Sequence, residues 1–208
     1  MQPTPRTTPS RLAKRAQYDE QTVYSILDES LFCTVSFTID GQPFALPTAF
    51  ARYDDRIYIH GSVGSHFIRE IEKGGPVCIS VMLTDELVVA KSAFHHSANY
   101  RSVVVFSNAE KVEDPALKWD ALRWITEKIV PNSWEYLRPM TESEVRKTTV
   151  LAFPIVEASA KLRTGMPKDD EEDQALPIWS GLIPLRTVRG TPVADEFSQE
   201  IALPQHLL

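Results

Sequence analysis

The residues best suited to chemistry lie together in the stretch HGSVGSHFIREI, residues 60–71. It contains two histidines, two glycines and two serines, at the point where an apolar strand pattern gives way to a helical one. Three interpretations fit such a junction: an ordinary helix start, a metal site, or a binding site for an anion. The chemistry of the side chains favours the third.

A helix that begins after Ser65 presents unpaired backbone N–H groups and the positive end of its dipole. Small and hydrogen-bonding side chains surround that position: His60, Gly61, Ser62, Gly64 and His66. This combination is typical of a phosphate-binding turn, although serine-capped helix starts without a ligand are also common. A metal site is less well supported, because the histidines lack a set of Cys, Asp or Glu partners at ligand spacing.

Other candidate residues are less specific when taken alone. His95 and His96 are adjacent, so on an extended chain they point to opposite faces and do not easily bind one ion. Arg101 and Ser102 open an apolar strand, and Trp179 lies in the apolar segment LPIWSGLIPL. No Ser-His-Asp, Cys-His or paired-carboxylate arrangement is readable. Any chemistry is therefore expected to come from a bound cofactor.

Composition limits the class of protein. The chain has 208 residues, 43% of them hydrophobic, which is enough for one domain with a real core. Its net charge of −6 does not favour nucleic acid as a partner. No apolar run is long enough to span a membrane, and the first residues lack the apolar centre of a secretion signal. The only cysteines, Cys33 and Cys78, lie in apolar strand-like runs, so we expect reduced thiols and a cytoplasmic protein.

Strand patterns recur along the chain, separated by turn signals. Asp40-Gly41 predicts a hairpin and Asp54-Asp55 a second turn. We expect strands at 31–40, 42–53, 56–60, 76–83, 86–91, 100–112 and 148–165. The expected helices are 18–30 with an Asp19 cap, 66–73 with a Ser65 cap, a helix opened by Asp114-Pro115 that reaches Ile129, and a short one with a Thr141–Glu144 capping box.

The tally of about six strands without βαβ alternation predicts a mainly β chain with peripheral helices, built as a six-stranded antiparallel split barrel. We divide it into a flexible N-terminal arm at 1–17, a barrel domain at 18–165 and a C-terminal part at 166–208. That last part begins with a charged linker, whose acidic run lacks the glycine and the distal glutamate of a calcium loop. Its tail after Leu185 is expected to drape over a partner subunit.

The order of four segments resembles the FMN-binding split-barrel family related to pyridoxamine 5′-phosphate oxidase, and most of all its nitroimidazole-resistance-like branch. The segments are LPTAF, RIYIHGSVGSHFIREI, NYRSVVVFSNAEKV and ASAKLRTGMPKDDEEDQALPIWSGLIPL. Together they cover most of residues 18–185. The resemblance implies a split β-barrel that binds FMN at the interface of a homodimer.

The same resemblance implies a role for particular residues. The phosphate-binding turn of the family falls on His60, Gly61, Ser62, Ser65 and His66. Its arginine-polar pair falls on Arg101 and Ser102. The strand around Pro47, Thr48 and Ala49 would pass the flavin ring and its ribityl chain. Trp179 would reach the flavin from the other subunit.

The chain also departs from the family pattern. His66 stands where relatives often have arginine or lysine, which predicts a weaker or pH-dependent charge on the phosphate. Ser107 stands where the oxidase has glycine. The C-terminal arginine-histidine pair that grips the substrate phosphate has no counterpart, so genuine pyridoxamine 5′-phosphate oxidase activity is not expected.

Three functions remain open on the sequence alone. The first is an FMN-dependent oxidoreductase that transfers hydride to or from a small planar molecule, with NADH or NADPH as a candidate electron donor. The second is a flavin-binding or sensing protein without turnover. The third keeps the barrel but binds haem through a histidine.

Overall fold

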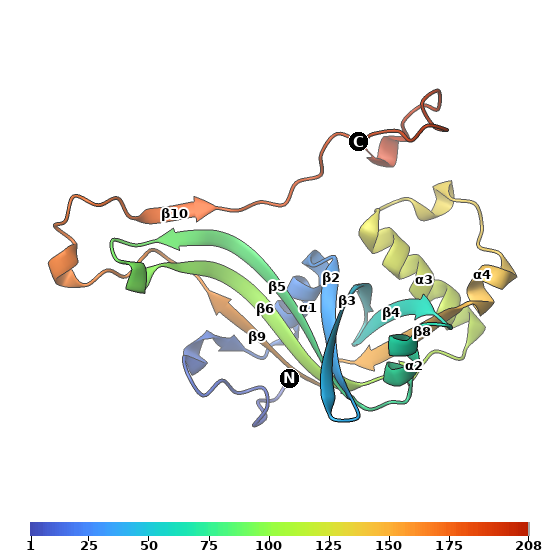
Figure 1. Cartoon of the computed structure of the whole chain (residues 1–208), viewed down its shortest axis with the longest axis horizontal. Coiled ribbons are helices and arrows are strands. Elements are labelled where there is room, and N and C mark those ends of the chain that lie inside the picture. The colour runs from blue at the N-terminus through green and yellow to red at the C-terminus, as the bar shows by residue number, and fades with distance from the viewer. Residues whose placement is uncertain (208) are drawn as a thin grey trace.

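Ten strands join into one curved antiparallel sheet in the computed structural model, which describes residues 1–207 (Figure 1). The strands are β1 (Ala16–Gln17), β2 (Phe32–Ile39), β3 (Gln42–Tyr53), β4 (Arg56–Ser62), β5 (Pro76–Val89), β6 (Ser97–Asn108), β7 (Glu110–Lys111), β8 (Thr148–Pro154), β9 (Glu157–Arg163) and β10 (Gly181–Pro184). Their order is β1-β9-β6-β5-β2-β3-β4-β8-β7, with β10 beside β5. The predicted fold class is confirmed. The strand count exceeds six chiefly because β1, β7 and β10 are short additions.

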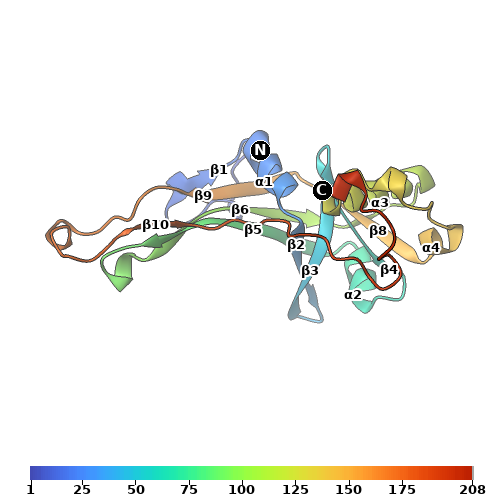
Figure 2. The same cartoon turned by 90° about the horizontal axis from the view of Figure 1, so that it is seen from above.

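Four α-helices accompany the sheet: α1 (Glu20–Glu29), α2 (His66–Glu72), α3 (Pro115–Ile129) and α4 (Glu142–Arg146). Their caps follow the local sequence, as predicted. Asp19 accepts a hydrogen bond from the Thr22 N–H at 2.8 Å, and Asp114 accepts one from the Leu117 N–H at 2.7 Å. The capping box of α4 is complete. Seen from above, the β5–β6 hairpin and β10 project from one end of the molecule, and α3 and α4 lie at the other (Figure 2).

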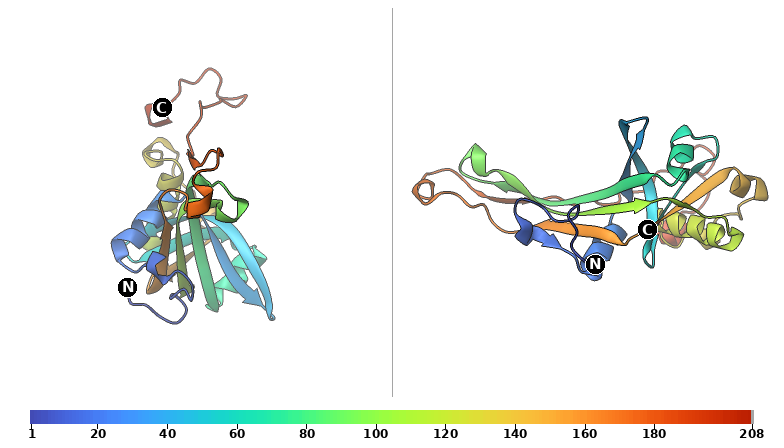
Figure 3. Two further views of the ribbon diagram at one scale, coloured as in Figure 1. Left: turned by 90° about the vertical axis from the view of Figure 1, so that its left-hand side faces the viewer. Right: turned by 90° about the horizontal axis from the view of Figure 1, so that it is seen from below.

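The main core fills the inside of the barrel. Inward residues alternate along the strands, as in Cys33, Val35 and Phe37 of β2. Helix α1 adds Val23, Ile26 and Leu27 to this core. It lies on the opposite side of the strands from the β2–β3 hairpin (Figure 3, left). A second, smaller core lies on the other surface of β3, β4 and β8, where α3 packs through Ala121, Leu122 and Ile125.

The barrel is split between β3 and β4. Their pairing begins at Tyr53 and Arg56 and ends at Phe50 and Ile59. Beyond that point β3 continues beside β2, whereas β4 continues beside β8. Helix α2 packs at this opening, and its Phe67 ring contacts the rings of Phe37 and Phe44 of the β2–β3 hairpin, with centroids 6.0 and 5.7 Å apart.

The expected strands differ from the structure in three places. The one expected at 100–112 begins at Ser97 and ends at Asn108, and β7 follows as a separate strand. The turn expected between 76–83 and 86–91 is a β-bulge between Thr84 and Glu86, so β5 is one long strand and the hairpin turns after it. Thr-Asp lacks the glycine that a tight turn needs, and the bulge lets the Asp85 side chain bind Arg101. The strand expected at 148–165 is broken after Pro154, in agreement with the limits that proline places on a ladder.

Residues 1–17 lie along the barrel. Ala16 and Gln17 pair with β9, and the N-terminal amine donates to the Tyr18 carbonyl at 2.6 Å. The Arg6 guanidinium is hydrogen-bonded to Glu157, and Thr7 is buried. This segment, expected to be a flexible arm, therefore has specific contacts with the domain. Within residues 1–207, the structure contains no helix of the length and apolarity needed to cross a membrane.

One lysine joins α3 to α1 across the core. Lys128 donates to the Leu27 carbonyl at 2.7 Å, and its amine lies 3.4 Å from the centroid of the Phe50 ring. Burial lowers the pKa of Lys128 to about 8, and the nearby Arg52 guanidinium adds to this, whereas the carboxylate of Asp28 opposes it.

This lysine predicts a pH dependence of stability. The pKa of Lys128 is about 8 in the folded protein. In the unfolded chain the pKa of a lysine is about 10.4. The unfolded state binds more protons between these values, so the free energy of unfolding should rise with pH there. Lys128→Met should remove this contribution, which is about 1 kcal/mol or more between pH 8 and pH 10. Urea denaturation of both proteins at several pH values measures it, and parallel profiles would contradict it.

Candidate functional site

A hollow of about 470 Å³ lies on the outside of the barrel, across β2, β3, β5 and β6. The lining includes one row of side chains that cross these strands in register. Thr34 pairs with Pro47 on one side and with Ser80 on the other, and Ser80 pairs with Val104. These positions alternate with the inward residues of the main core, so they face outward. The full lining is Phe32, Cys33, Thr34, Pro47, Ser80, Val81, Met82, Ser102 and Val104.

The hollow combines apolar surface with hydroxyl groups. Phe32 and Met82 are each 60% exposed, which is unusual for large apolar side chains. Thr34, Ser80 and Ser102 place hydroxyls among them. Apolar surface with a few polar groups is the composition of small-molecule sites. A flat, apolar ring system with polar edges would suit it.

Two of the predicted site residues line this hollow directly. Pro47 comes from β3, and Ser102 comes from β6, where it pairs with Met82. Thr48, between Pro47 and Ala49, pairs with the buried Cys33 and so belongs to the inward row. Ala49 packs against the smaller core under α3, one residue before the last β3–β4 pair.

The turn from β4 into α2 is capped as an ordinary helix start. The Ser65 hydroxyl accepts from the Ile68 N–H at 3.4 Å, and the Ser62 hydroxyl accepts from the Gly64 N–H at 3.2 Å. Gly61 is required by packing, because a Cβ there would lie 2.6 Å from Cγ1 of Ile68. The helix start and the glycine thus have structural roles of their own, and phosphate binding at this turn stays a prediction.

The two histidines of the turn differ in environment. His60 is the residue after Ile59, at the opening of the split, and its side chain has no hydrogen bond or ion pair within residues 1–207. Desolvation by the atoms around the ring lowers the pKa of His60, although the residue still reaches solvent. His66 is also exposed, over 62% of its side chain, and its Nδ1 lies 4.0 Å from Glu70.

The structure separates Arg101 from the hollow. Adjacent residues on a strand point to opposite faces, so Arg101 points away from the side that Ser102 occupies. Its guanidinium binds Glu29 at the end of α1, at 2.8 Å, and Asp85 at 2.7 Å. These carboxylates raise the pKa of Arg101, with Glu29 the stronger influence. The resemblance places the family's arginine-polar pair here, but within the chain this arginine is committed to an ion-pair network.

Trp179 is also apart from the other predicted residues. It lies just before β10, is 64% exposed, and covers Gly181, where a Cβ would lie 2.8 Å from its ring. Gly181 pairs with Val89, well along β5 from Met82. Within one chain it does not join the hollow, so contact with a flavin from the other subunit stays a prediction.

Sequence reasoning missed most of the lining. Phe32, Thr34, Ser80, Met82 and Val104 were read only as parts of strands. A signal was present in LFCTVSF, where Phe32 stands at an outward position of the alternation that buries Cys33 and Val35. A large aromatic residue on the outer face of a strand indicates a binding or contact surface.

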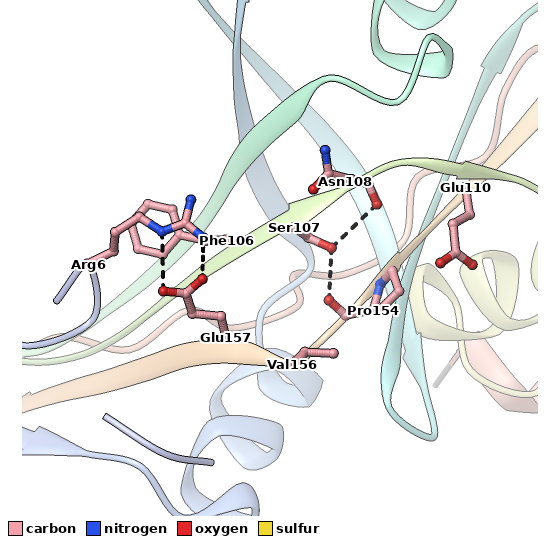
Figure 4. Close-up of a pocket in the computed structure, with 8 residues that line it drawn as sticks. All are labelled: Arg6, Phe106, Ser107, Asn108, Glu110, Pro154, Val156 and Glu157. Atoms are coloured by element: carbon pink, nitrogen blue, oxygen red, sulfur yellow. Dashed lines mark hydrogen bonds and ion pairs between the residues drawn. The ribbon is translucent and has the colours of Figure 1, made fainter. Parts of the chain in front are cut away.

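A second hollow of about 310 Å³ lies where the N-terminal segment crosses the end of β6 (Figure 4). Its charged groups are already paired. Arg6 binds Glu157 and lies over the Phe106 ring at 4.9 Å, and Glu110 binds Arg56. None of the predicted site residues lines it. Arg6 is its one lining residue from the N-terminal segment.

The fold and the outer hollow define a split-barrel protein, and comparison with known families agrees. The family model of pyridoxamine 5′-phosphate oxidase matches residues 19–162. The chain therefore belongs to this family, and the resemblance inferred from the sequence is confirmed. A comparison with curated proteins found no match.

Several solved structures are similar to this chain. The flavocytochrome Anf3 from Azotobacter vinelandii has a TM-score of 0.91 and 38% identity, over 98% of this chain and 95% of that one. The FAD and heme binding protein from Mycobacterium smegmatis has a TM-score of 0.88 and 35% identity, over 93% of this chain and 95% of that one. A proposed 5-nitroimidazole antibiotic resistance protein from Bacteroides thetaiotaomicron VPI-5482 shares the fold, at 23% identity, a TM-score of 0.60 and coverage of 70% and 85%.

Gly61 provides a test of how the turn is built. Gly61→Ala should destabilise the protein by about 1–3 kcal/mol, because its Cβ would overlap Ile68 and push α2 away from β4. Gly64→Ala is the matched control, since the nearest atom to its Cβ would be the Ser62 hydroxyl at 3.6 Å. Thermal and chemical denaturation of both variants measure the difference. Equal stabilities would show that the strand and helix are not in tight contact at Gly61.

Proposed function

We propose that this protein is a flavin-binding redox protein that also binds haem. The observation that carries the proposal is likeness over nearly the whole chain to a flavocytochrome and to an FAD and heme binding protein. Identities of 38% and 35% over more than nine-tenths of this chain go beyond a shared fold. Pyridoxamine 5′-phosphate oxidase activity is not part of the proposal.

The outer hollow is the proposed flavin site. Its apolar residues, Phe32, Met82 and Val104, would lie against the flavin ring, and the Ser80 and Ser102 hydroxyls would hydrogen-bond to its polar edge. Pro47 lies on β3 close to the split between β3 and β4. The turn at 62–66 beside that split would bind the phosphate groups of the flavin. We propose FAD where the sequence alone suggested FMN, because the relative from Mycobacterium smegmatis is described as binding FAD.

The flavin, when bound, supplies hydride or single-electron transfer, and haem supplies single-electron chemistry. The chain's own residues would hold and tune these groups. Phe32 and Met82 would exclude water from one side of the ring. The hydroxyls of Thr34, Ser80 and Ser102 would fix its orientation. We propose an oxidoreductase for a small planar substrate with NADH or NADPH as donor. Absence of turnover over a broad acceptor panel would favour a flavin-binding protein without catalysis.

We propose that His60 would hold the iron of the haem when haem is bound. A histidine binds iron through its neutral ring, and the desolvation that lowers the pKa of His60 favours that form. Its ring also has no hydrogen-bonding or ion-pair partner in residues 1–207. Three other histidines each have one: His66 with Glu70, His95 with Asp170 and His96 with the Ser92 carbonyl. His206 has a ring contact with Tyr136 and lies at the far end of the C-terminal arm.

We further propose that the protein acts as a homodimer in the cytoplasm. Phe32 and Met82 leave an apolar surface on the outer barrel face, which a second copy would cover together with the flavin. Both cysteines are free, as a reducing compartment would keep them. Nucleic acid is not proposed as a partner, because the chain carries a net charge of −6.

Filling the hollow tests the flavin site. Ser80→Phe should weaken FAD binding at least ~10-fold, because a phenyl ring would occupy the space between Thr34 and Val104. Ser159→Phe is the matched control. Ser159 pairs with Val104 on the same face but does not line the hollow. Quenching of flavin fluorescence gives the dissociation constants for FAD and FMN with each protein.

Equal loss of affinity in the two variants, or none in either, would remove the hollow as the site. Tighter binding of FMN than of FAD would restore the cofactor expected from the sequence.

Haem ligation by His60 has a spectroscopic test. His60→Ala, reconstituted with haem, should lose or shift the Soret band, and added imidazole should restore it by filling the ligand position. His66→Ala is the matched control at the other end of the turn and should keep the wild-type spectrum. The opposite pattern would assign ligation to His66. If His60→Ala keeps the Soret band but binds FAD more weakly, His60 contributes to the phosphate-binding turn and not to haem ligation.

A further inference from the structure

The last part of the chain, residues 185–207, forms an extended arm with few contacts to its own molecule. It follows β10, whose Pro184 pairs with Glu86, and the Leu185 N–H donates to the Asp85 carbonyl at 2.9 Å. The arm then runs clear of the barrel (Figures 1 and 3). In residues 1–207, its next contacts with the body are a hydrogen bond from Arg189 to the Ile129 carbonyl at 2.9 Å and the ring of His206 near that of Tyr136.

The composition of the arm is unlike that of a solvated tail. Val193 is 93% exposed, Phe197 82% and Ile201 60%. An unattached segment is typically polar and lacks large apolar side chains. Ordering such a segment also costs conformational entropy that its few hydrogen bonds to the body do not offset. These side chains therefore require a surface outside their own molecule.

The course of the arm is shared with a related protein. The match with the flavocytochrome from Azotobacter vinelandii extends over 98% of this chain with a TM-score of 0.91, so it includes most of the arm. An arm free in solution would have no reason to take the same path in two proteins that are 38% identical. A common surface beneath the arm explains the common path.

The point where the arm leaves the body, after Pro184, indicates which surface it covers. The arm leaves the body beside β5, and β5 also supplies Ser80 and Met82 to the outer hollow. A chain that leaves from an interface of two-fold symmetry can cross to the other copy, and the other copy returns an identical arm. The exposed Phe32 and Met82 offer apolar area for such an exchange.

We propose that residues 185–207 form a clasp that closes over a second copy of this chain, with Val193, Phe197 and Ile201 buried against that copy. The clasp rests on the homodimer of the proposed function. It adds to that proposal the segment that would hold the two copies together. It does not depend on the identity of the cofactor. The Arg101–Asp85 ion pair would act as a positioning contact, because it holds the bulge whose carbonyl binds Leu185.

The test compares the full chain with Val193→Asp/Phe197→Asp by sedimentation velocity at micromolar concentration. The clasp predicts a wild-type dimer and a dissociation constant at least ~10-fold higher in the variant. Phe94→Asp/Val156→Asp is the matched control. Both of its positions are strongly exposed outside the arm, at 89% and 76%, so it should stay dimeric. A monomeric wild type, a variant as dimeric as the wild type, or equal weakening in the control would each overturn the clasp.

A second measurement locates the arm directly. A photoreactive benzoylphenylalanine placed at Phe197 should give cross-linked product of twice the chain mass, because the side chain lies on the other copy. Cross-links only within one chain would overturn the proposal even if the protein is a dimer. FAD affinity is measured on the same samples. A cross-linked dimer that binds no flavin would sustain the clasp and contradict the proposed function, so the two failures are distinguishable.

Discussion

The structure depends on one constraint, the end of β3–β4 pairing at Phe50 and Ile59. Two strands that continued in register would close the barrel fully and leave no room for a helix between them. Because they separate, β4 can turn into α2 at the opening, and the Phe67 ring packs on the β2–β3 hairpin. Gly61 allows this packing by leaving space for Ile68. The turn with the histidines exists because the barrel is split.

Because side chains alternate along each strand, the inward face of the sheet packs the core and the outward face lines the hollow. The inward row of β2 fills the barrel with Cys33 and Val35, and the outward row carries Phe32 and Thr34 to the hollow. A shift of one residue in register would exchange these rows. Arg101 and Ser102 illustrate the same rule on β6. One stabilises the end of α1 through Glu29, and the other lines the hollow.

Local features were predictable from the sequence and features set by distant strands were not. Asp19, Asp114 and the Thr141–Glu144 box cap their helices within a few residues, so their signals are complete in the sequence. Thr84-Asp85 looked like a turn because its distant partner, Arg101, was not visible. The hollow was likewise hidden, since its row joins four strands that only the fold brings together. Adjacency on a strand implies that Arg101 and Ser102 face opposite ways, but the sequence could not show which of them faces the hollow.

Strand β5 connects these features into one system. Its first half supplies the hollow, its bulge at Asp85 binds Arg101 and the start of the arm, and its second half pairs with β10. The ladder with β6 shifts register at the bulge between Thr84 and Glu86, so the hollow lies before the bulge and the pairing with β10 after it. One strand therefore carries both part of the lining of the hollow and the attachment of the arm. In a symmetric pair, the arm of each copy would start from the same strand that lines its own hollow. This arrangement explains why an apolar arm and an open hollow occur together in one chain.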